Sequence, residues 1–146
     1  MVHCGEMTAI EQKNLTKRDR NSIIIMVIFT FVISVLIPYL LLLWRNVDFS
    51  ANIDASVING ILTGTAIVFG FVTFELREVS VNIPLRIALS FPLLIFLFIT
   101  VITYSFSAMF YIVDNMTLFI ASSNFLFNII YYGIVASIKD TYNQKK

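Results

Sequence analysis

Hydrophobic and polar positions are grouped along this chain in long blocks rather than alternating residue by residue. Four blocks are apolar and contain no charged residue, and they cover residues 23–43, 57–74, 87–113 and 118–138. A helix needs about 17–25 residues to cross the hydrocarbon core of a bilayer. Each block therefore predicts a membrane-spanning helix, and Pro92 predicts a kink or a first turn near the start of the third.

Basic residues are concentrated on one side of the four predicted spans. An even number of spans places both termini on the same side of the membrane. Of the ten Lys and Arg residues, nine fall on that side and Arg45 alone falls on the other. Cytoplasmic loops carry the excess of Lys and Arg in membrane proteins, so we expect both termini in the cytoplasm and a multi-pass protein of the cell membrane. The nine are Lys13, Lys17, Arg18, Arg20, Arg77, Arg86, Lys139, Lys145 and Lys146.

The predicted fold class is an all-α integral membrane protein, a four-transmembrane-helix bundle. Residues 1–22 form a cytoplasmic polar tail, residues 23–138 form the transmembrane domain, and residues 139–146 form a second cytoplasmic tail. Only residues 114–117 connect the last two spans, so these spans are expected to be antiparallel neighbours. No segment outside the spans is large enough for a separate soluble domain.

Composition supports this interpretation and excludes several classes of function. The chain is 58% hydrophobic and 13% charged, with a mean hydropathy of +0.86, whereas soluble domains are about 25% charged. The net charge is only +1, and no run of Lys and Arg offers a face for phosphates, so nucleic acid is not an expected partner. The expected partner is the lipid bilayer.

Candidate catalytic and metal-binding residues are scarce. The chain has one His and one Cys, His3 and Cys4, both in the N-terminal tail. One of each cannot supply a zinc, haem or iron–sulfur site or a catalytic triad within one chain. No ionisable residue lies in the middle of a span, where proton-coupled transporters place one. We therefore expect no enzyme activity, no cofactor and no bound metal.

A regular stripe of small and polar residues follows the second predicted span. Successive spacings are 3, 4, 3, 4, 3 and 4 residues, which places all seven positions on one side of a helix. The stripe consists of Ser56, Asn59, Thr63, Ala66, Gly70, Thr73 and Arg77.

The residues beside this stripe and those opposite it are expected to have different surroundings. Gly60 and Gly64 beside it have the GxxxG spacing that lets another helix backbone approach closely. The opposite side carries large apolar residues and is expected to face lipid; these are Ile61, Val68 and Val72.

Polar residues also recur in the third and fourth spans. Thr100, Thr103 and Ser107 follow one side of the third span, and their hydroxyl groups can bond to their own helix backbone. Asn124 and Asn128 lie four residues apart on the fourth span. A buried amide needs a hydrogen-bond partner, so we expect these two to face the bundle and pair with Ser or Thr of the second or third span.

Two hypotheses of function are favoured over a third, a membrane-embedded enzyme acting on lipid, for which the chain offers no cluster of acid–base or metal-binding residues near the spans. In the first, the chain is a homo-oligomeric channel or pore, and the stripe of the second span lines the path. In the second, it is a non-catalytic accessory or scaffold subunit of a larger membrane complex. The alternative to a path-lining stripe is a dry packing seam, with the second span as the central packing helix of the four-helix bundle. Self-association, or association with other membrane subunits, is expected in both cases.

Overall fold

The computed structural model describes residues 17–78, 83–110 and 114–143. These residues form four long helices, which are α2 (Lys17–Trp44), α3 (Ala55–Glu78), α4 (Ile83–Phe110) and α5 (Asn115–Asn143). All four are long and apolar enough to cross a membrane, which confirms the predicted number of helical spans.

The helix ends differ from the predicted span ends by a few residues. Helix α2 begins at Lys17, within the stretch 1–22 that was predicted as a polar tail. Helix α4 ends at Phe110, and the last predicted residues of the third span, 111–113, lie outside the described part. His3 and Cys4 also lie outside it.

The outer surface of the bundle is apolar, as a lipid environment requires. Large side chains point outward along the helices; Ile25, Phe29, Phe91 and Phe98 are each 64–66% exposed. In water, so large an exposed apolar surface would be a site of association. In the hydrocarbon of a bilayer, its exposure costs no free energy. The described helices are thus those of a membrane protein.

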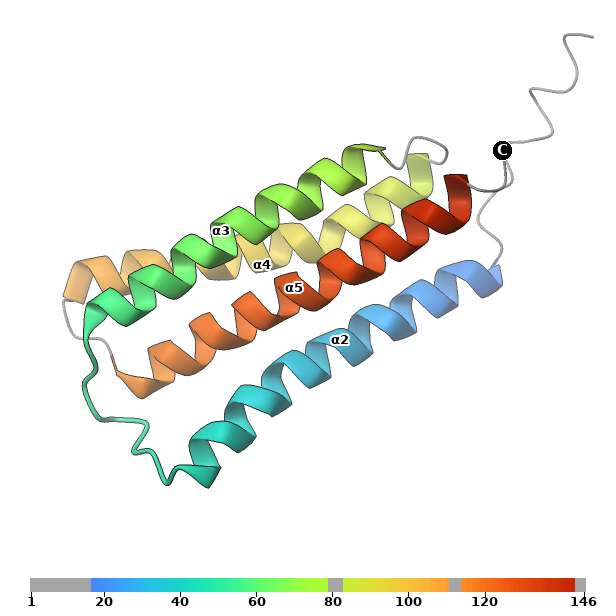
Figure 1. Cartoon of the computed structure of the whole chain (residues 1–146). Helices are drawn as coiled ribbons and strands as arrows, with labels where there is room; N and C mark the ends of the chain where they lie inside the picture. Colours follow the sequence, from blue (N-terminus) through green and yellow to red (C-terminus); the bar gives the residue numbers. More distant parts are fainter. Residues whose placement is uncertain (1–16, 79–82, 111–113, 144–146) are drawn as a thin grey trace, which may run out of the picture.

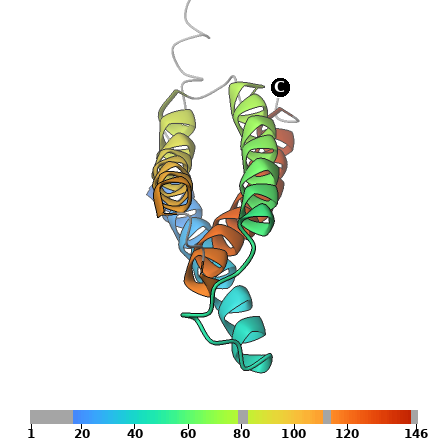
Figure 2. The same ribbon diagram turned by 90° about the vertical axis from the view of Figure 1, so that its left-hand side faces the viewer.

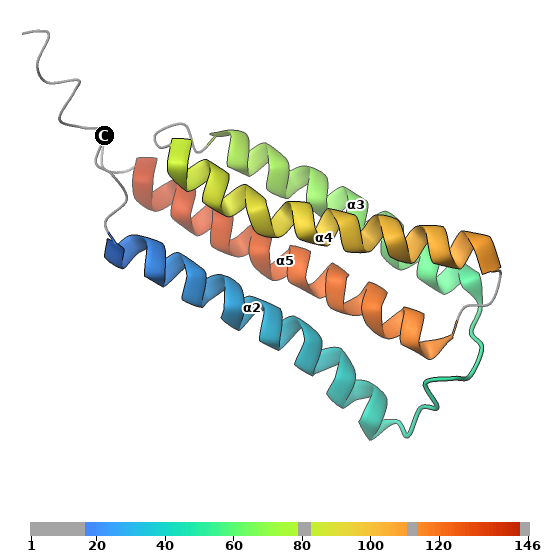
Figure 3. The same ribbon diagram turned by 180° about the vertical axis from the view of Figure 1, so that it is seen from behind.

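Helix α5 is the centre of the bundle. It packs most extensively against α3 and also contacts α2 and α4, and Figures 1 and 3 show it between its neighbours from opposite sides. In Figure 2, α3 and α4 form two separate arms, with α2 and the first half of α5 below them. Helix α2 begins, and α5 ends, at the same end of the bundle; we call it the terminal end and the opposite end the loop end.

Two apolar cores occupy the two ends of the bundle. The larger core, toward the terminal end, joins α3, α4 and α5 through Val72, Leu76, Leu89, Leu93, Phe96, Phe127, Tyr131 and Val135. The rings of Phe96 and Phe127 stack in it with centroids 3.6 Å apart. The smaller core, toward the loop end, consists of Ile58, Leu62 and Ala121. Buried polar residues lie between the two.

Backbone hydrogen bonds define the end of α2. Asn46 adopts a positive φ of 50°, and the N–H groups of Asn46 and Val47 donate to the carbonyls of Leu43 and Leu42 at 3.0 and 3.1 Å. This is the pairing of a Schellman motif, in which a left-handed residue closes a helix. Asn tolerates that conformation better than most residues.

The following loop is tied to the start of α5. The Asn115 amide donates to the Asp48 carbonyl at 2.7 Å, and its backbone N–H donates to the Ala51 carbonyl at 3.1 Å. Met116 N–H donates to the Phe49 carbonyl at 3.1 Å. The free N–H groups of the first turn of a helix need such acceptors, so the loop completes α5.

Candidate functional site

The stripe predicted from the second span forms an exposed face of α3. All seven of its residues, from Ser56 to Arg77, are exposed, and we call them the outward α3 face. None of them packs into the interior of the four-helix bundle. Among the described helices this face therefore has no packing role in the interior of the bundle, and it is open to contact from outside the chain.

The expected lipid-facing side of α3 was assigned wrongly. Val72 is fully buried in the larger core, and Ile61 and Val68 pack against the two cores. Large apolar side chains make many more van der Waals contacts with α5 than small ones do, so the apolar side turns inward. Hydropathy does not reveal this choice, because lipid tails are as apolar as a protein core.

The two glycines of the GxxxG spacing meet different surroundings. A Cβ atom added to Gly64 would lie 3.1 Å from Cε2 of Phe125, a ring atom of α5. At Gly60 the same atom would meet nothing within 4 Å. Within the chain, then, Gly64 admits an aromatic side chain rather than a helix backbone, and Gly60 lies open beside the outward α3 face.

Hydroxyl groups on the outward α3 face already have acceptors. Thr63 donates to the Asn59 carbonyl at 2.8 Å, and Thr73 donates to the Gly70 carbonyl at 2.8 Å. Each oxygen keeps its lone pairs for an outside donor but has no proton left to give. This face can accept hydrogen bonds from water or a partner, yet it does not need them.

A second polar region lies inside the bundle, near the middle of each helix, and we call it the polar centre. Its members are at most 2% exposed except Thr100, which is half-buried. They come from all four helices and consist of Thr30, Ser34, Thr65, Thr100, Asn124 and Asn128.

One hydrogen bond joins two helices across this polar centre. The Asn124 amide of α5 donates to the Thr100 hydroxyl oxygen of α4, and that hydroxyl donates in turn to the Phe96 carbonyl at 2.8 Å. The prediction that Asn124 pairs with Ser or Thr of another span is confirmed. Thr103 also donates to its own helix, at the Ile99 carbonyl, as expected.

Asn128 faces the bundle but bonds within its own helix. Its amide nitrogen lies 2.9 Å from the Asn124 carbonyl and 3.1 Å from Asn124 Oδ1. Its Oδ1 atom is buried without a hydrogen-bond partner. The predicted pairing of Asn128 with Ser or Thr of another span was therefore wrong, because Asn124 one turn away is nearer.

Three members of the polar centre were not predicted from the sequence. Thr30, Ser34 and Thr65 are hydroxyl residues in apolar spans, and each donates to the carbonyl of its own helix four residues back. Such residues are tolerated in any span, so composition gives no signal. The four-residue spacing of Thr30 and Ser34 was the one available hint.

The terminal end of the bundle holds an ion pair between two helices. Lys139 Nζ of α5 lies 2.7 Å from Glu75 Oε2 of α3, and their side chains are 21% and 17% exposed. Tyr131 links α5 to α4 nearby, since its hydroxyl donates to the Leu89 carbonyl at 2.5 Å. These contacts link α5 to α3 and to α4 in the half of the bundle toward the terminal end.

The three acidic residues at the loop end serve as turn and helix caps. Hydrogen bonds from the backbone N–H and the hydroxyl of Thr117 hold the pKa of Asp114 below its usual value of 3.8. Bonds from Ser56 lower the pKa of Asp54 in the same way. Because these carboxylates are engaged by helix termini, they do not converge on a common cation.

Comparison of the chain with protein-family models, with curated proteins and with solved structures finds no match.

Proposed function

We propose that this protein is a small multi-pass membrane protein that acts as a homo-oligomer. In this proposal copies of the chain meet through the outward α3 face, and a polar path crosses the membrane along their contact. The proposal places the termini in the cytoplasm, because nine of the ten Lys and Arg residues lie on their side of the spans.

The observation that carries the proposal is the exposure of the outward α3 face along the whole length of α3. Small residues at membrane-helix surfaces allow close approach of another helix, and here they are turned away from the chain's own core. Gly60 and Gly70 meet no neighbouring atom within 4 Å of a built Cβ. A flat, small-residue face of this kind accommodates either a second helix or a file of water.

The chemistry of the face favours water or a small anion as the transported species. Asn59 offers an amide near the loop end, and Thr63 offers oxygen lone pairs one turn further in. Ala66 and Gly70 leave room at mid-membrane. Arg77 at the terminal end favours anions over cations, and the acidic residues at the other end are engaged as caps.

A second candidate function is that of a non-catalytic accessory subunit of a larger membrane complex. The hydrogen bonds of Thr63 and Thr73 to their own helix support it, because a face whose hydroxyl protons are engaged can be covered by a dry partner helix. The bound partner would then be a helix of another protein.

Two measurements on the purified protein test the proposal. The first is the mass of the complex in detergent, which is expected to be a small multiple of the chain's 16.6 kDa. The second is ion and water flux in liposomes for the parent and for Thr63→Leu and Ala66→Leu. We expect flux in the parent and at least a tenfold loss in both variants.

Val101→Leu serves as the control, because Val101 is 54% exposed on α4, away from the outward α3 face. A monomer removes the proposal. An oligomer without flux, or with flux indifferent to both α3 substitutions, favours the accessory subunit instead.

A further inference from the structure

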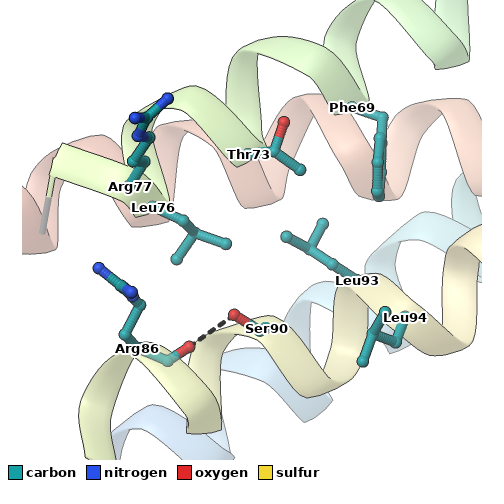
Figure 4. A pocket seen from close by; sticks show the side chains of 8 residues that line it. All are labelled: Phe69, Thr73, Leu76, Arg77, Arg86, Ser90, Leu93 and Leu94. Carbon is teal, nitrogen blue, oxygen red and sulfur yellow. Dashed lines mark hydrogen bonds between the residues drawn. The ribbon is translucent and has the colours of Figure 1, made fainter. Parts of the chain in front are cut away.

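A groove opens between α3 and α4 at the terminal end of the bundle. Its volume is about 310 Å³, at the lower limit of the range of about 300–1,000 Å³ that is typical of small-molecule sites. Four residues from each helix line it, namely Phe69, Thr73, Leu76 and Arg77 of α3 and Arg86, Ser90, Leu93 and Leu94 of α4. Figure 4 shows these side chains.

The groove is cationic at its mouth and apolar further in. Arg77 lies in the last turn of α3 and Arg86 in the first turns of α4, so both guanidinium groups are at headgroup depth. Leu93 lies seven residues beyond Arg86, which is about 10 Å deeper along the helix. Leu76 and Leu93 point toward each other across the groove (Figure 4).

Both arginines are available for an external anion. They are exposed, and within the described residues neither forms an ion pair, since Glu75 is engaged by Lys139. In Figure 4 Arg86 extends toward α3, whereas the Arg77 guanidinium points outward from α3. Ser90 donates to the Arg86 carbonyl at 2.7 Å, and Thr73 donates to Gly70, so the arginines supply the donors for a phosphate.

We propose that this groove binds an anionic phospholipid from the leaflet on the side of the chain termini. Arg86 holds the headgroup phosphate, the exposed Arg77 side chain turns toward it from the rim of the groove, and an acyl chain lies along Leu93, Leu94 and Phe69. Charge complementarity selects this occupant, because two arginines without an ion-pair partner among the described residues, above an apolar slot, match a phosphate above a hydrocarbon chain. All lining residues belong to one chain, so the groove is complete in a single copy. Thr73 and Arg77 also belong to the outward α3 face, so a partner helix that covers this end of the face would compete with the lipid.

Competition between two lipids tests the site. Phosphatidylglycerol and phosphatidylcholine with identical acyl chains are offered to the purified protein in mixed micelles, and bound lipid is counted by native mass spectrometry. We expect about 25-fold preference for phosphatidylglycerol, with each arginine contributing about fivefold. Arg77→Gln and Arg86→Gln together are expected to abolish the preference.

Arg45→Gln is the matched control, because it removes an exposed arginine at the opposite end of the bundle. Equal binding of the two lipids by the parent overturns the proposal, as does a loss of preference in Arg45→Gln as large as that in Arg77→Gln. Inorganic phosphate that displaces the lipid at millimolar concentration assigns the site to a soluble anion and also overturns it.

A groove-filling substitution separates a built site from diffuse surface attraction. Ser90→Phe keeps both arginines and occupies the slot, so it is expected to reduce phosphatidylglycerol binding at least fivefold. Thr73→Phe repeats the test from the exposed wall on α3, and helix content by circular dichroism confirms that each variant is folded. Undiminished binding in folded variants contradicts the assignment to the groove.

Discussion

The Asn124 amide of α5 donates to the hydroxyl oxygen of Thr100 of α4 in the middle of the bundle. The Thr100 hydroxyl donates in turn to the Phe96 carbonyl, so the series of hydrogen bonds continues into the backbone of α4. Asn124 Oδ1 accepts in turn from the Asn128 amide at 3.1 Å. These bonds link α5 to the backbone of α4 at the polar centre.

We predict that Asn124 and Thr100 are energetically coupled. Asn124→Leu, Thr100→Val and the double variant form a cycle whose coupling energy is expected to be about 0.6–2 kcal/mol, the range for polar contacts between membrane helices. Unfolding in denaturing detergent, followed by circular dichroism, measures it. Thr103→Val is the control, because the Thr103 hydroxyl also donates to its own helix but has no hydrogen bond to Asn124 in the described part of the chain. Coupling of Asn124 to Thr103 as strong as to Thr100 would refute the prediction.

The positions of the helices could be predicted from the sequence, but their rotations could not. Charge-free runs of the right length define a span by bilayer thickness alone, and all four helices contain the predicted runs as far as the chain is described. Rotation depends on which side chains interlock. Val72 was expected to face lipid and is fully buried. Lipid and the protein core are similarly apolar, so hydropathy does not predict which of the two an apolar side chain faces.

Some of the buried polar residues could be predicted from the sequence and others could not. Asn124 was identified because a buried amide needs a partner, and the structure supplies Thr100. Thr65 gave no such signal, because a threonine on a helix can satisfy itself, and it does so at the Ile61 carbonyl. The groove between α3 and α4 was out of reach as well, since it depends on how far the two helices stand apart.

Substitutions at the two glycines of α3 are predicted to have different effects. Gly64→Leu would force a large side chain against the Phe125 ring and separate α3 from α5, at a cost of about 1–3 kcal/mol. Gly60→Leu meets open space within the chain, so its unfolding free energy should change by less than about 0.5 kcal/mol. Its effect should appear instead as a smaller complex in detergent.

Thermal unfolding and the mass of the complex are measured for both variants and the parent. A parent-like unfolding temperature in Gly64→Leu would show that α3 and α5 do not pack as described. An unchanged complex in Gly60→Leu would mean that the surface beside the outward α3 face is not a contact between chains.

Acid is predicted to destabilise the protein through the cap of α5. Hydrogen bonds from Thr117 lower the pKa of Asp114 in the folded chain, so its contribution is present above the usual value of 3.8 and is lost as pH falls through the lower, folded pKa. Asp114→Asn retains a capping oxygen without a titrating group. It should therefore flatten the dependence of stability on pH below about pH 4.

Thr117→Val provides the complementary test. It removes the hydroxyl donor at 2.8 Å but keeps the backbone donor, so the pKa of Asp114 should rise part of the way to its usual value. Acid unfolding then begins at a higher pH than in the parent. Identical acid profiles for the parent, Asp114→Asn and Thr117→Val would show that this cap contributes nothing to the pH dependence.

The final prediction concerns orientation. Replacing Cys4, the single cysteine, by Ser gives a background in which new cysteines report the side of the membrane that they face. Ala51 and Asp140 are exposed and lie at opposite ends of the bundle. A membrane-impermeant maleimide applied to intact cells should label Ala51→Cys, and it should label Asp140→Cys only after permeabilisation, because the excess of Lys and Arg on the side of the termini favours a cytoplasmic location for that side.

Asn21→Cys adds a second report from the terminal end, since Asn21 is exposed near the start of α2. It should match Asp140→Cys in every condition. Labelling of Ala51→Cys and Asp140→Cys from one side would contradict the antiparallel arrangement of the helices. Labelling of Ala51→Cys from the inside and Asp140→Cys from the outside would preserve the bundle but reverse its orientation, which would place Arg77 and Arg86 against the outer leaflet and move the lipid site with them.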